Sequence, residues 1–347
     1  MAAGYDQTIT LNNTLTISST SNPPQQPPNS LIAGGSIGGP ADLVIQAGLN
    51  WVGGTMFGSG TTWVTNLMNA GNTDATVNAS LTINAPSGVT LDQRTLDNQA
   101  KTTWTDGPIT TISALIENDA GQEPEKYLGN ASFGEFEIAA NNSSSMSDPN
   151  APVGTDRTNS LFSNEGSVLK DATFPGQGGT SGIFITFNND SNSSVTVAGG
   201  GLTFLGGGAS SGTFQVDLGG NLSFLRGASS IPYTWNSGAK FLGPGDTLVG
   251  ADVVVGKVYV ANEFTFGSGT ISGPGTIQFS YLFHWTGGSF VNGGTAEVLP
   301  AATATAESVF VPPPSLVLSG WDLIIDAGAV FKQDGANIAM GNGALIN

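Results

Sequence analysis

One short pattern occurs twice in the chain, as Leu202-Thr203-Phe204-Leu205 and again as Leu222-Ser223-Phe224-Leu225. A glycine follows each copy, at Gly207 and Gly227, and every matched pair has the same separation of about 20 residues. A β-solenoid with coils of this length stacks equivalent residues of successive coils about 4.8 Å apart. The repeat therefore predicts that Phe204 and Phe224 are stacked neighbours on one face of one sheet.

The rest of the chain is also patterned for short strands. Apolar and polar residues alternate in segments such as 183–187, 253–260 and 316–318, and Gly, Asn, Asp or Pro bounds each segment. The 347 residues include 50 Gly and 18 Pro, and even the best helical candidate, 112–128, contains both. The sequence thus predicts an all-β protein. Its repeats favour a right-handed parallel β-helix with about 20 residues per coil, and about nine coils over 160–347, rather than a sandwich or a barrel.

A second pattern places a glycine three residues after an aromatic residue, and a Gly-Thr pair six residues after that glycine. It begins at Trp51, at Phe266 and at Trp285 with the same spacing in all three copies. Glycine adopts the positive φ of a tight corner without a steric penalty. We therefore expect Trp51 and Trp285 at equivalent solenoid positions, each at least half buried, with the glycine at a turn.

A third pattern places an asparagine two residues after an apolar residue. The three copies are Ile116 with Asn118, Phe162 with Asn164, and Phe187 with Asn189. Stacked coils would bring the apolar side chains into an internal column and the asparagines into a hydrogen-bonded ladder.

These tracts resemble the repeats of large bacterial extracellular parallel β-helix proteins, the filamentous-haemagglutinin-like and autotransporter-passenger-like surface proteins. The residues that carry the resemblance are 162–168, 187–189, 195–204, 212–214 and 222–224, and the units at Trp51 and Trp285 are similar to units of the same proteins. The resemblance covers about residues 45–120 and 160–347. It implies a secreted or cell-surface β-helix, which in such proteins is most often non-catalytic.

Proline and polar tracts divide the chain into four expected parts. Residues 1–40, with Pro pairs inside a Ser- and Asn-rich tract, are expected to form a linker or cap, and 41–140 a first solenoid section. Residues 141–159 read as a polar insertion. Residues 160–347 are expected to form the main section and to continue beyond the C-terminus in the native protein.

Composition excludes several classes of function. The chain has 9 Lys and Arg against 26 Asp and Glu, a net charge of −17, so a nucleic acid backbone would be repelled. Without cysteine, and with His284 as the single histidine, thiol chemistry and multi-histidine metal sites are excluded. No apolar run reaches the roughly 18 residues of a membrane span. Residues 1–4 lack the basic region and apolar core of a signal peptide, and the expected localisation is extracellular or at the cell surface.

Candidate chemical groups are few, and each has a plainer structural interpretation. His284, between Phe283 and Trp285, is expected to be a structural residue of a coil. Two carboxylate pairs near strand ends would suit glycoside hydrolysis if they converged, namely Asp246 with Asp252 and Asp322 with Asp326.

Calcium has two candidate segments. Residues 243–248 resemble a calcium-binding nonapeptide with the wrong spacing, and an acidic loop could hold calcium loosely through Glu117, Asp119, Glu123 and Glu125. Neither pattern is specific. We therefore assign no catalytic, cofactor-binding or metal residue from the sequence.

Two classes of function remain open. The favoured class is a non-catalytic structural or adhesin-type rod that contacts a surface glycan, a protein or copies of itself. The alternative is a β-helix that acts on polysaccharides, either an enzyme or a protein like a phage tailspike. A carboxylate-lined cleft would favour the alternative, and an even polar face would favour the rod.

Overall fold

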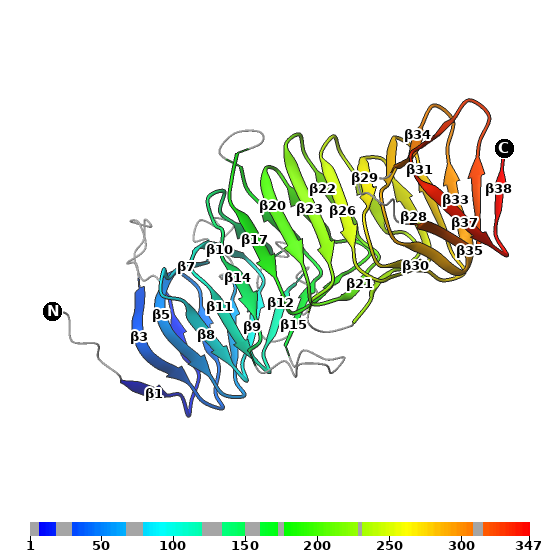
Figure 1. The fold of residues 1–347 in the computed structure, drawn as a ribbon. Coiled ribbons are helices and arrows are strands. Elements are labelled where there is room, and N and C mark those ends of the chain that lie inside the picture. Colours follow the sequence, from blue (N-terminus) through cyan, green and yellow to red (C-terminus); the bar gives the residue numbers. More distant parts are fainter. Residues whose placement is uncertain are drawn as a thin grey trace, which may run out of the picture.

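The chain forms a parallel β-helix whose three sides are ladders of short strands (Figure 1). The computed structural model describes residues 7–18, 30–66, 79–119, 134–149, 160–172, 177–227, 231–307 and 315–347. Almost every strand pairs, in parallel, with the strand one coil before it and the strand one coil after it. Within these residues no helix is long and apolar enough to cross a membrane.

We name the three sides ladders A, B and C. Ladder A contains, in order, β1 (Thr8–Thr10), β3 (Ser30–Gly38), β5 (Gly48–Phe57), β8 (Val89–Asp92), β11 (Ile109–Ile112), β14 (Ser145–Ser147), β17 (Thr180–Ile183), β20 (Gly200–Phe204), β23 (Gly220–Leu225), β26 (Asp246–Gly250), β29 (Glu263–Phe266), β32 (Leu282–Trp285), β34 (Thr303–Glu307) and β36 (Val330–Asp334). Ladder B contains β2 (Leu15–Ile17), β4 (Leu43–Ile45), β6 (Thr61–Val64), β9 (Thr95–Asn98), β12 (Leu115–Asn118), β15 (Leu161–Asn164), β18 (Thr186–Asn189), β21 (Gly208–Ser210), β24 (Tyr233–Trp235), β27 (Val253–Val255), β30 (Thr270–Ser272), β33 (Ser289–Val298), β35 (Ser315–Ile325) and β37 (Asn337–Gly341).

Ladder C contains the first part of β3 and of β5, then β7 (Ser80–Asn84), β10 (Lys101–Asp106), β13 (Glu135–Ile138), β16 (Ser167–Lys170), β19 (Ser194–Val197), β22 (Thr213–Val216), β25 (Lys240–Leu242), β28 (Lys257–Val260), β31 (Thr276–Phe279), the second part of β33 and of β35, and β38 (Ala344–Ile346). Four long strands, β3, β5, β33 and β35, turn a corner and belong to two ladders each. Through them the three ladders join into one continuous sheet.

The register predicted from the repeat at Leu202 and Leu222 is confirmed. Leu202 pairs with Leu222 and Phe204 with Phe224, and the two phenylalanine rings are stacked with centroids 5.4 Å apart. Between residues 160 and 347, ladders B and C each hold nine strands, the number of coils expected. Coil length is less regular than the repeat suggests, because the chain from Val249 to its partner Phe266 is much shorter than the chain from Phe162 to its partner Phe187.

The core is the space between the three ladders. Side chains alternate inward and outward along each strand, as in β15, β16, β18 and β19, where every second residue is buried. Aromatic rings fill the interior and touch across coils. Phe136, Phe162 and Phe187, for example, form successive edge-to-face contacts with centroids 5.0 and 5.3 Å apart.

The two tryptophans of the aromatic pattern are buried as expected, but they are not equivalent. Trp51 and Trp285 are each 1% exposed. Trp285 pairs with Phe266 in ladder A, whereas Trp51 pairs with Ile83 in ladder C, so the predicted equivalence is wrong. The pattern marks a corner, where an inward aromatic residue is followed by a turn glycine. Because each coil has a corner at the end of every ladder, the same pattern can occur in different ladders.

The corner glycines confirm the turn part of that prediction. Gly54, Gly269 and Gly288 have φ of 88°, 83° and 78°. A Cβ atom on Gly54 would lie 2.3 Å from the carbonyl oxygen of Gly35 in the preceding coil. Both the backbone conformation and the close approach of coils therefore exclude a side chain there.

Ladder strands lie within two of the segments expected to stand outside the solenoid. In the expected linker or cap, 1–40, the described residues include β1, β2 and β3, which are the first strands of the ladders. The expected insertion 141–159 contains β14, whose buried Met146 pairs with Ile109 and Ile183 in ladder A. Residues 150–159 lie outside the described residues. Because β12 to β14 pair directly with β15 to β17, the sections 41–140 and 160–347 form one uninterrupted solenoid.

Candidate functional site

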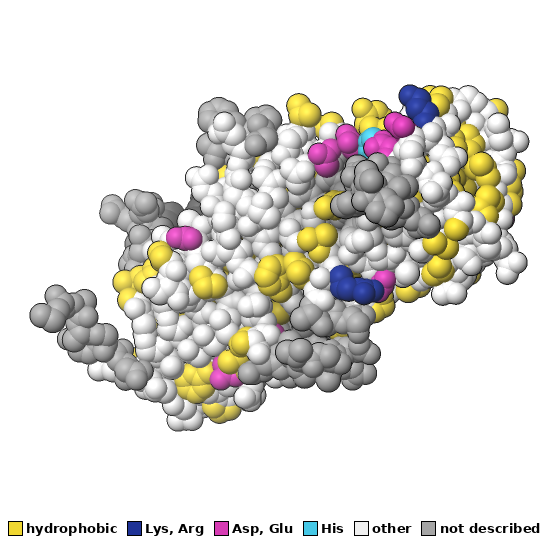
Figure 2. All heavy atoms as spheres, viewed as in Figure 1, with side chains coloured by type: hydrophobic (Ala, Val, Ile, Leu, Met, Phe, Trp, Pro, Cys, Tyr) yellow, Lys and Arg dark blue, Asp and Glu magenta, His cyan; other side chains and the backbone are white. Residues whose placement is uncertain are grey.

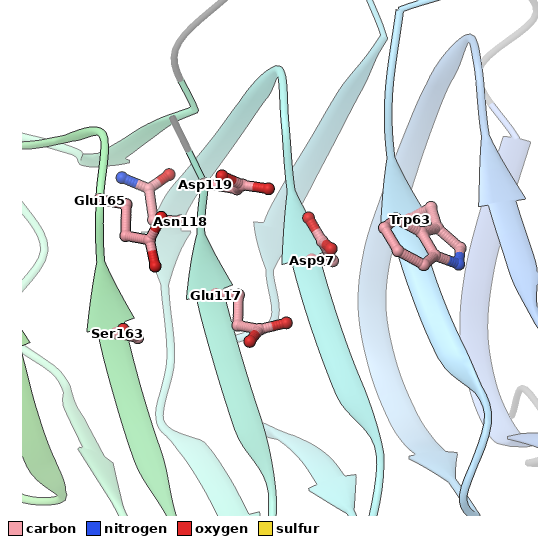
Figure 3. A pocket seen from close by; sticks show the side chains of 7 residues that line it. All are labelled: Trp63, Asp97, Glu117, Asn118, Asp119, Ser163 and Glu165. Carbon is pink, nitrogen blue, oxygen red and sulfur yellow. The ribbon is translucent and has the colours of Figure 1, made fainter. Parts of the chain in front are cut away.

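A pocket of about 320 Å³ opens on the outer face of ladder B (Figure 3). Strands β6, β9, β12 and β15 and the turns after them supply its walls. Four carboxylates and one indole dominate the lining, which consists of Trp63, Asp97, Glu117, Asn118, Asp119, Ser163 and Glu165. The volume falls within the range of pockets that hold small molecules.

The asparagine ladder positions these side chains. The Asn98, Asn118, Asn164 and Asn189 side chains point inward, and each of the first three donates from Nδ2 to the Oδ1 of the next, at 2.7, 2.7 and 2.8 Å. This confirms the ladder that the third sequence pattern predicts. Since side chains alternate along an extended chain, the residues on either side of each inward asparagine point outward.

Two outward rows follow from that alternation. The row on the strands is Trp63, Asp97, Glu117 and Ser163, in register through successive pairings. The second row lies at the turns, where Asp119 and Glu165 immediately follow Asn118 and Asn164. Figure 3 shows the Asp97 and Glu117 side chains on neighbouring strands, with Trp63 beyond Asp97. The pocket therefore rests on regular strands tied together by a buried hydrogen-bonded column.

Four of the seven residues that line the pocket are acidic. None of its lining residues is Lys, Arg or His, and the whole chain carries a net charge of −17. Asp97 and Glu117 are direct partners on adjacent strands, whose spacing is about 4.8 Å. Trp63 is partly exposed, whereas the other five tryptophans of the chain are at most 1% exposed. The lining thus places a partly exposed aromatic side chain beside acidic ones.

A second hollow, of about 380 Å³, lies on ladder A and has a different chemistry. Its lining contains no charged side chain and consists of Pro108, Ser143, Ser144, Ser145, Thr180, Ser181, Gly182, Phe184 and Thr203. Most of the residues that line this hollow carry hydroxyl groups.

His284 lies on the outer face of ladder A, among acidic side chains (Figure 2). Its Nδ1 is 2.8 Å from Thr305 Oγ1 and 3.1 Å from Glu307 Oε1, and its Nε2 is 3.5 Å from Glu263 Oε1. Hydrogen bonding to Thr305 and to His284 lowers the pKa of Glu307. These groups come from β29, β32 and β34, so the histidine links three coils.

The expected carboxylate pairs do not converge. Asp246 lies on β26 in ladder A, whereas Asp252 is bonded to Arg226 and to Thr270, which begins a ladder B strand. Asp322 and Asp326 are four residues apart along extended chain, a separation of roughly 13 Å. Neither pair has the geometry of a glycosidase dyad.

The two expected calcium segments lie in different parts of the fold. Asp246, in the segment 243–248, lies on ladder A away from the pocket. Glu117 and Asp119 line the pocket, while Glu123 and Glu125 lie outside the described residues. In the described part of the chain, no three His, Asp or Glu side chains are grouped so that they could hold a metal ion.

Sequence reasoning did not single out Asp97 or Glu165 as site residues. The chain from Trp63 to its partner Asp97, and the chain from Glu117 to its partner Ser163, are both longer than the chain from Asp97 to Glu117, so no fixed spacing connects the row. The available signal was the asparagine pattern, because an acidic residue flanking a ladder asparagine must face outward beside the acidic residues of adjacent coils.

No protein family, curated protein or solved structure matches this chain. The resemblance to bacterial surface β-helix proteins therefore stays a prediction from the repeats.

Proposed function

We propose that the protein is a secreted or cell-surface β-solenoid of the adhesin type, which binds a glycan in the pocket on ladder B without turning it over. The observation that carries the proposal is the partly exposed indole of Trp63, which lies beside the almost fully buried Asp97 and in one register row with Glu117.

The chemistry of the pocket suits a sugar. The C–H face of a pyranose packs on an indole, and carboxylates accept charge-assisted hydrogen bonds from hydroxyl or ammonium groups. The expected ligand is a neutral or amino-bearing oligosaccharide, because the lining is acidic and contains no Lys, Arg or His.

The fold suits a rod-like role. The ladders give a long, continuous surface, and the repeats resemble those of bacterial surface proteins. Binding weakly at one pocket per rod is compatible with adhesion, because many rods on one surface would bind together.

The proposal is tested by calorimetric titration with oligomers of glucose, glucosamine and galacturonic acid. We expect binding of the first or second and not of the third, and a loss of about tenfold or more in affinity in Asp97→Asn and in Glu117→Gln. Asp246→Asn is the matched control, since this exposed carboxylate lies on ladder A away from the pocket. Equal affinity in all three variants, or preference for the acidic oligomer, would contradict the proposal.

One observation favours a second candidate, a glycoside hydrolase. Asp97 and Glu117 are in direct register, and carboxylates about 5 Å apart are typical of retaining glycosidases. Release of reducing ends from a bound oligosaccharide, abolished by Glu117→Gln, would establish this activity and replace the non-catalytic proposal.

A further inference from the structure

Phe184 is the most exposed phenylalanine among the described residues, at 38%, whereas most of the others are buried in the core. It directly follows β17, where the chain leaves ladder A. Its backbone is tied to the preceding coil, because its N–H donates to the carbonyl oxygen of Met146 at 2.8 Å. An aromatic side chain therefore lies in solvent on a fixed part of the rod.

The Phe184 ring folds back onto the strand before it. A Cβ atom on Gly182 would overlap Cε1 of the ring, and Cζ and Cδ1 are the next nearest atoms. Gly182 does not have a positive φ, so its backbone conformation would accept an alanine. The glycine is needed for space, since it lets the ring lie against the outer face of ladder A.

A second side chain lies along the same face. Thr180 pairs with Gly201 of the next coil, and a Cβ atom on Gly201 would lie 2.6 Å from Thr180 Oγ1. The Thr180 side chain thus lies over one glycine and the Phe184 ring over another. Both side chains line the hollow of about 380 Å³ on ladder A.

Hydroxyl groups flank the ring on the neighbouring strands. Gly182 pairs with Ser145 in the coil before it and with Thr203 in the coil after it, so β14, β17 and β20 are neighbours in ladder A (Figure 1). Adjacent strands are about 4.8 Å apart. Ser145 and Thr203 are partly exposed and line the hollow, and each hydroxyl can both donate and accept hydrogen bonds.

The surroundings of the ring are uncharged. No charged side chain lines the hollow, and the outward row continues past Thr203 to Ser223. A charged group entering such a site would lose hydration without gaining a partner of opposite charge. An apolar ring with a few polar groups at its edge is the usual lining of a site for a small neutral molecule.

We propose that this hollow, the Phe184 site, binds an uncharged sugar ring. The sugar packs its C–H face against Phe184 and exchanges hydrogen bonds with the hydroxyls of Ser145 and Thr203. The Phe184 site lies on a different ladder from the pocket at Trp63, so this inference does not depend on glycan binding there. Because its lining lacks carboxylates, an amino group on the sugar should add no affinity here.

Saturation-transfer NMR with a linear tetramer of glucose tests the proposal. All chains, including the parent, carry Trp63→Ala, which removes the aromatic side chain of the pocket on ladder B. Phe184→Ala should weaken binding about tenfold because the ring is lost, and Gly182→Ala by a similar factor because its methyl group displaces the ring. Phe184→Tyr keeps the ring and should bind like the parent.

The matched control is Leu218→Ala, which truncates a residue 65% exposed in the turn between β22 and β23. It should bind like the parent. Circular dichroism shows whether each variant folds, and Gly182→Ala tests the site with the phenylalanine still present.

Three results would overturn the proposal: a parent chain that does not bind the glucose tetramer, Phe184→Ala that binds as tightly as the parent, or Leu218→Ala that loses as much affinity as Phe184→Ala. Tighter binding of glucosamine or galacturonic acid tetramers than of the glucose tetramer would also contradict a neutral site. Glycan binding on ladder B is measured separately, in Phe184→Ala chains that retain Trp63, so the two proposals can fail independently.

Discussion

At the scale of single residues, two buried cations hold corners of the coil. Lys170 Nζ donates to the carbonyl oxygens of Ala139, Ala140 and Asn142 at 2.7, 3.1 and 3.0 Å. Arg94 donates in the same way to carbonyls of the coils before it, among them those of Ala41 and Thr61. Both side chains are at most 1% exposed, and each supplies donors to peptide groups at a turn. Neither role could be predicted, because the partners belong to earlier coils and lie far away in the chain.

Lys170→Met should lower the free energy of unfolding by roughly 1–3 kcal/mol, because three buried carbonyls lose their donor. Chemical denaturation at pH 7 measures the loss. Lys240→Met, at an exposed lysine, is the control and should change stability little. A loss equal to that of the control would show that Lys170 contributes no net stabilisation.

Burial lowers the pKa of Lys170 to about 8, from an ordinary value of 10.5. Between these values the unfolded chain binds the proton more than the folded chain does, so the unfolding free energy rises with pH. Wild type should therefore gain up to about 3 kcal/mol relative to Lys170→Met between pH 8 and 10.5. Burial raises the pKa of Tyr233 in both proteins, and this lowers the free energy of unfolding of both as the pH rises. The contribution of Tyr233 therefore cancels when the two proteins are compared. A difference that is flat across this window would mean that the Lys170 pKa is not lowered.

At the scale of elements, the triplet centred on a ladder asparagine connects fold and site. The inward asparagine bonds to its equivalents, and the residues on either side of it include the acidic residues of the pocket. The sequence predicts the ladder at Asn118, Asn164 and Asn189, since the same local pattern recurs. It does not predict the pocket, because the outward residues differ from coil to coil and the coils between them differ in length.

Asn164→Ala should lower the free energy of unfolding by roughly 1–3 kcal/mol, because the bonds to Asn118 and Asn189 are lost in a buried site. The exposed Asn221→Ala is the matched control. Thermal unfolding followed by circular dichroism measures both. Equal midpoints for the two variants would show that the ladder adds no stability.

At the scale of the whole molecule, local patterns specify the coil but not its boundaries. The repeat at Leu202 and Leu222 predicts register because that coil has no insertion. Proline- and serine-rich tracts suggested domain breaks, yet β1, β2 and β14 are solenoid strands despite their polar neighbours. Pairing with adjacent coils outweighs local composition for strands of only three residues.

The net charge of −17 should oppose association between copies at low ionic strength. Salt screens charges beyond about 10 Å at 0.1 M, so the mean mass measured by light scattering should rise between 10 mM and 300 mM NaCl. A mean mass that falls over this range would indicate that attraction between opposite charges holds the copies together.

The most direct test of glycan binding in the pocket uses tryptophan fluorescence. Five of the six tryptophans are at most 1% exposed, so a ligand in the pocket should perturb chiefly Trp63. Titration with oligomers of glucosamine is predicted to change the emission of wild type saturably, with no change in Trp63→Phe. Unchanged emission of wild type, or the same change in Trp63→Phe, would contradict the account.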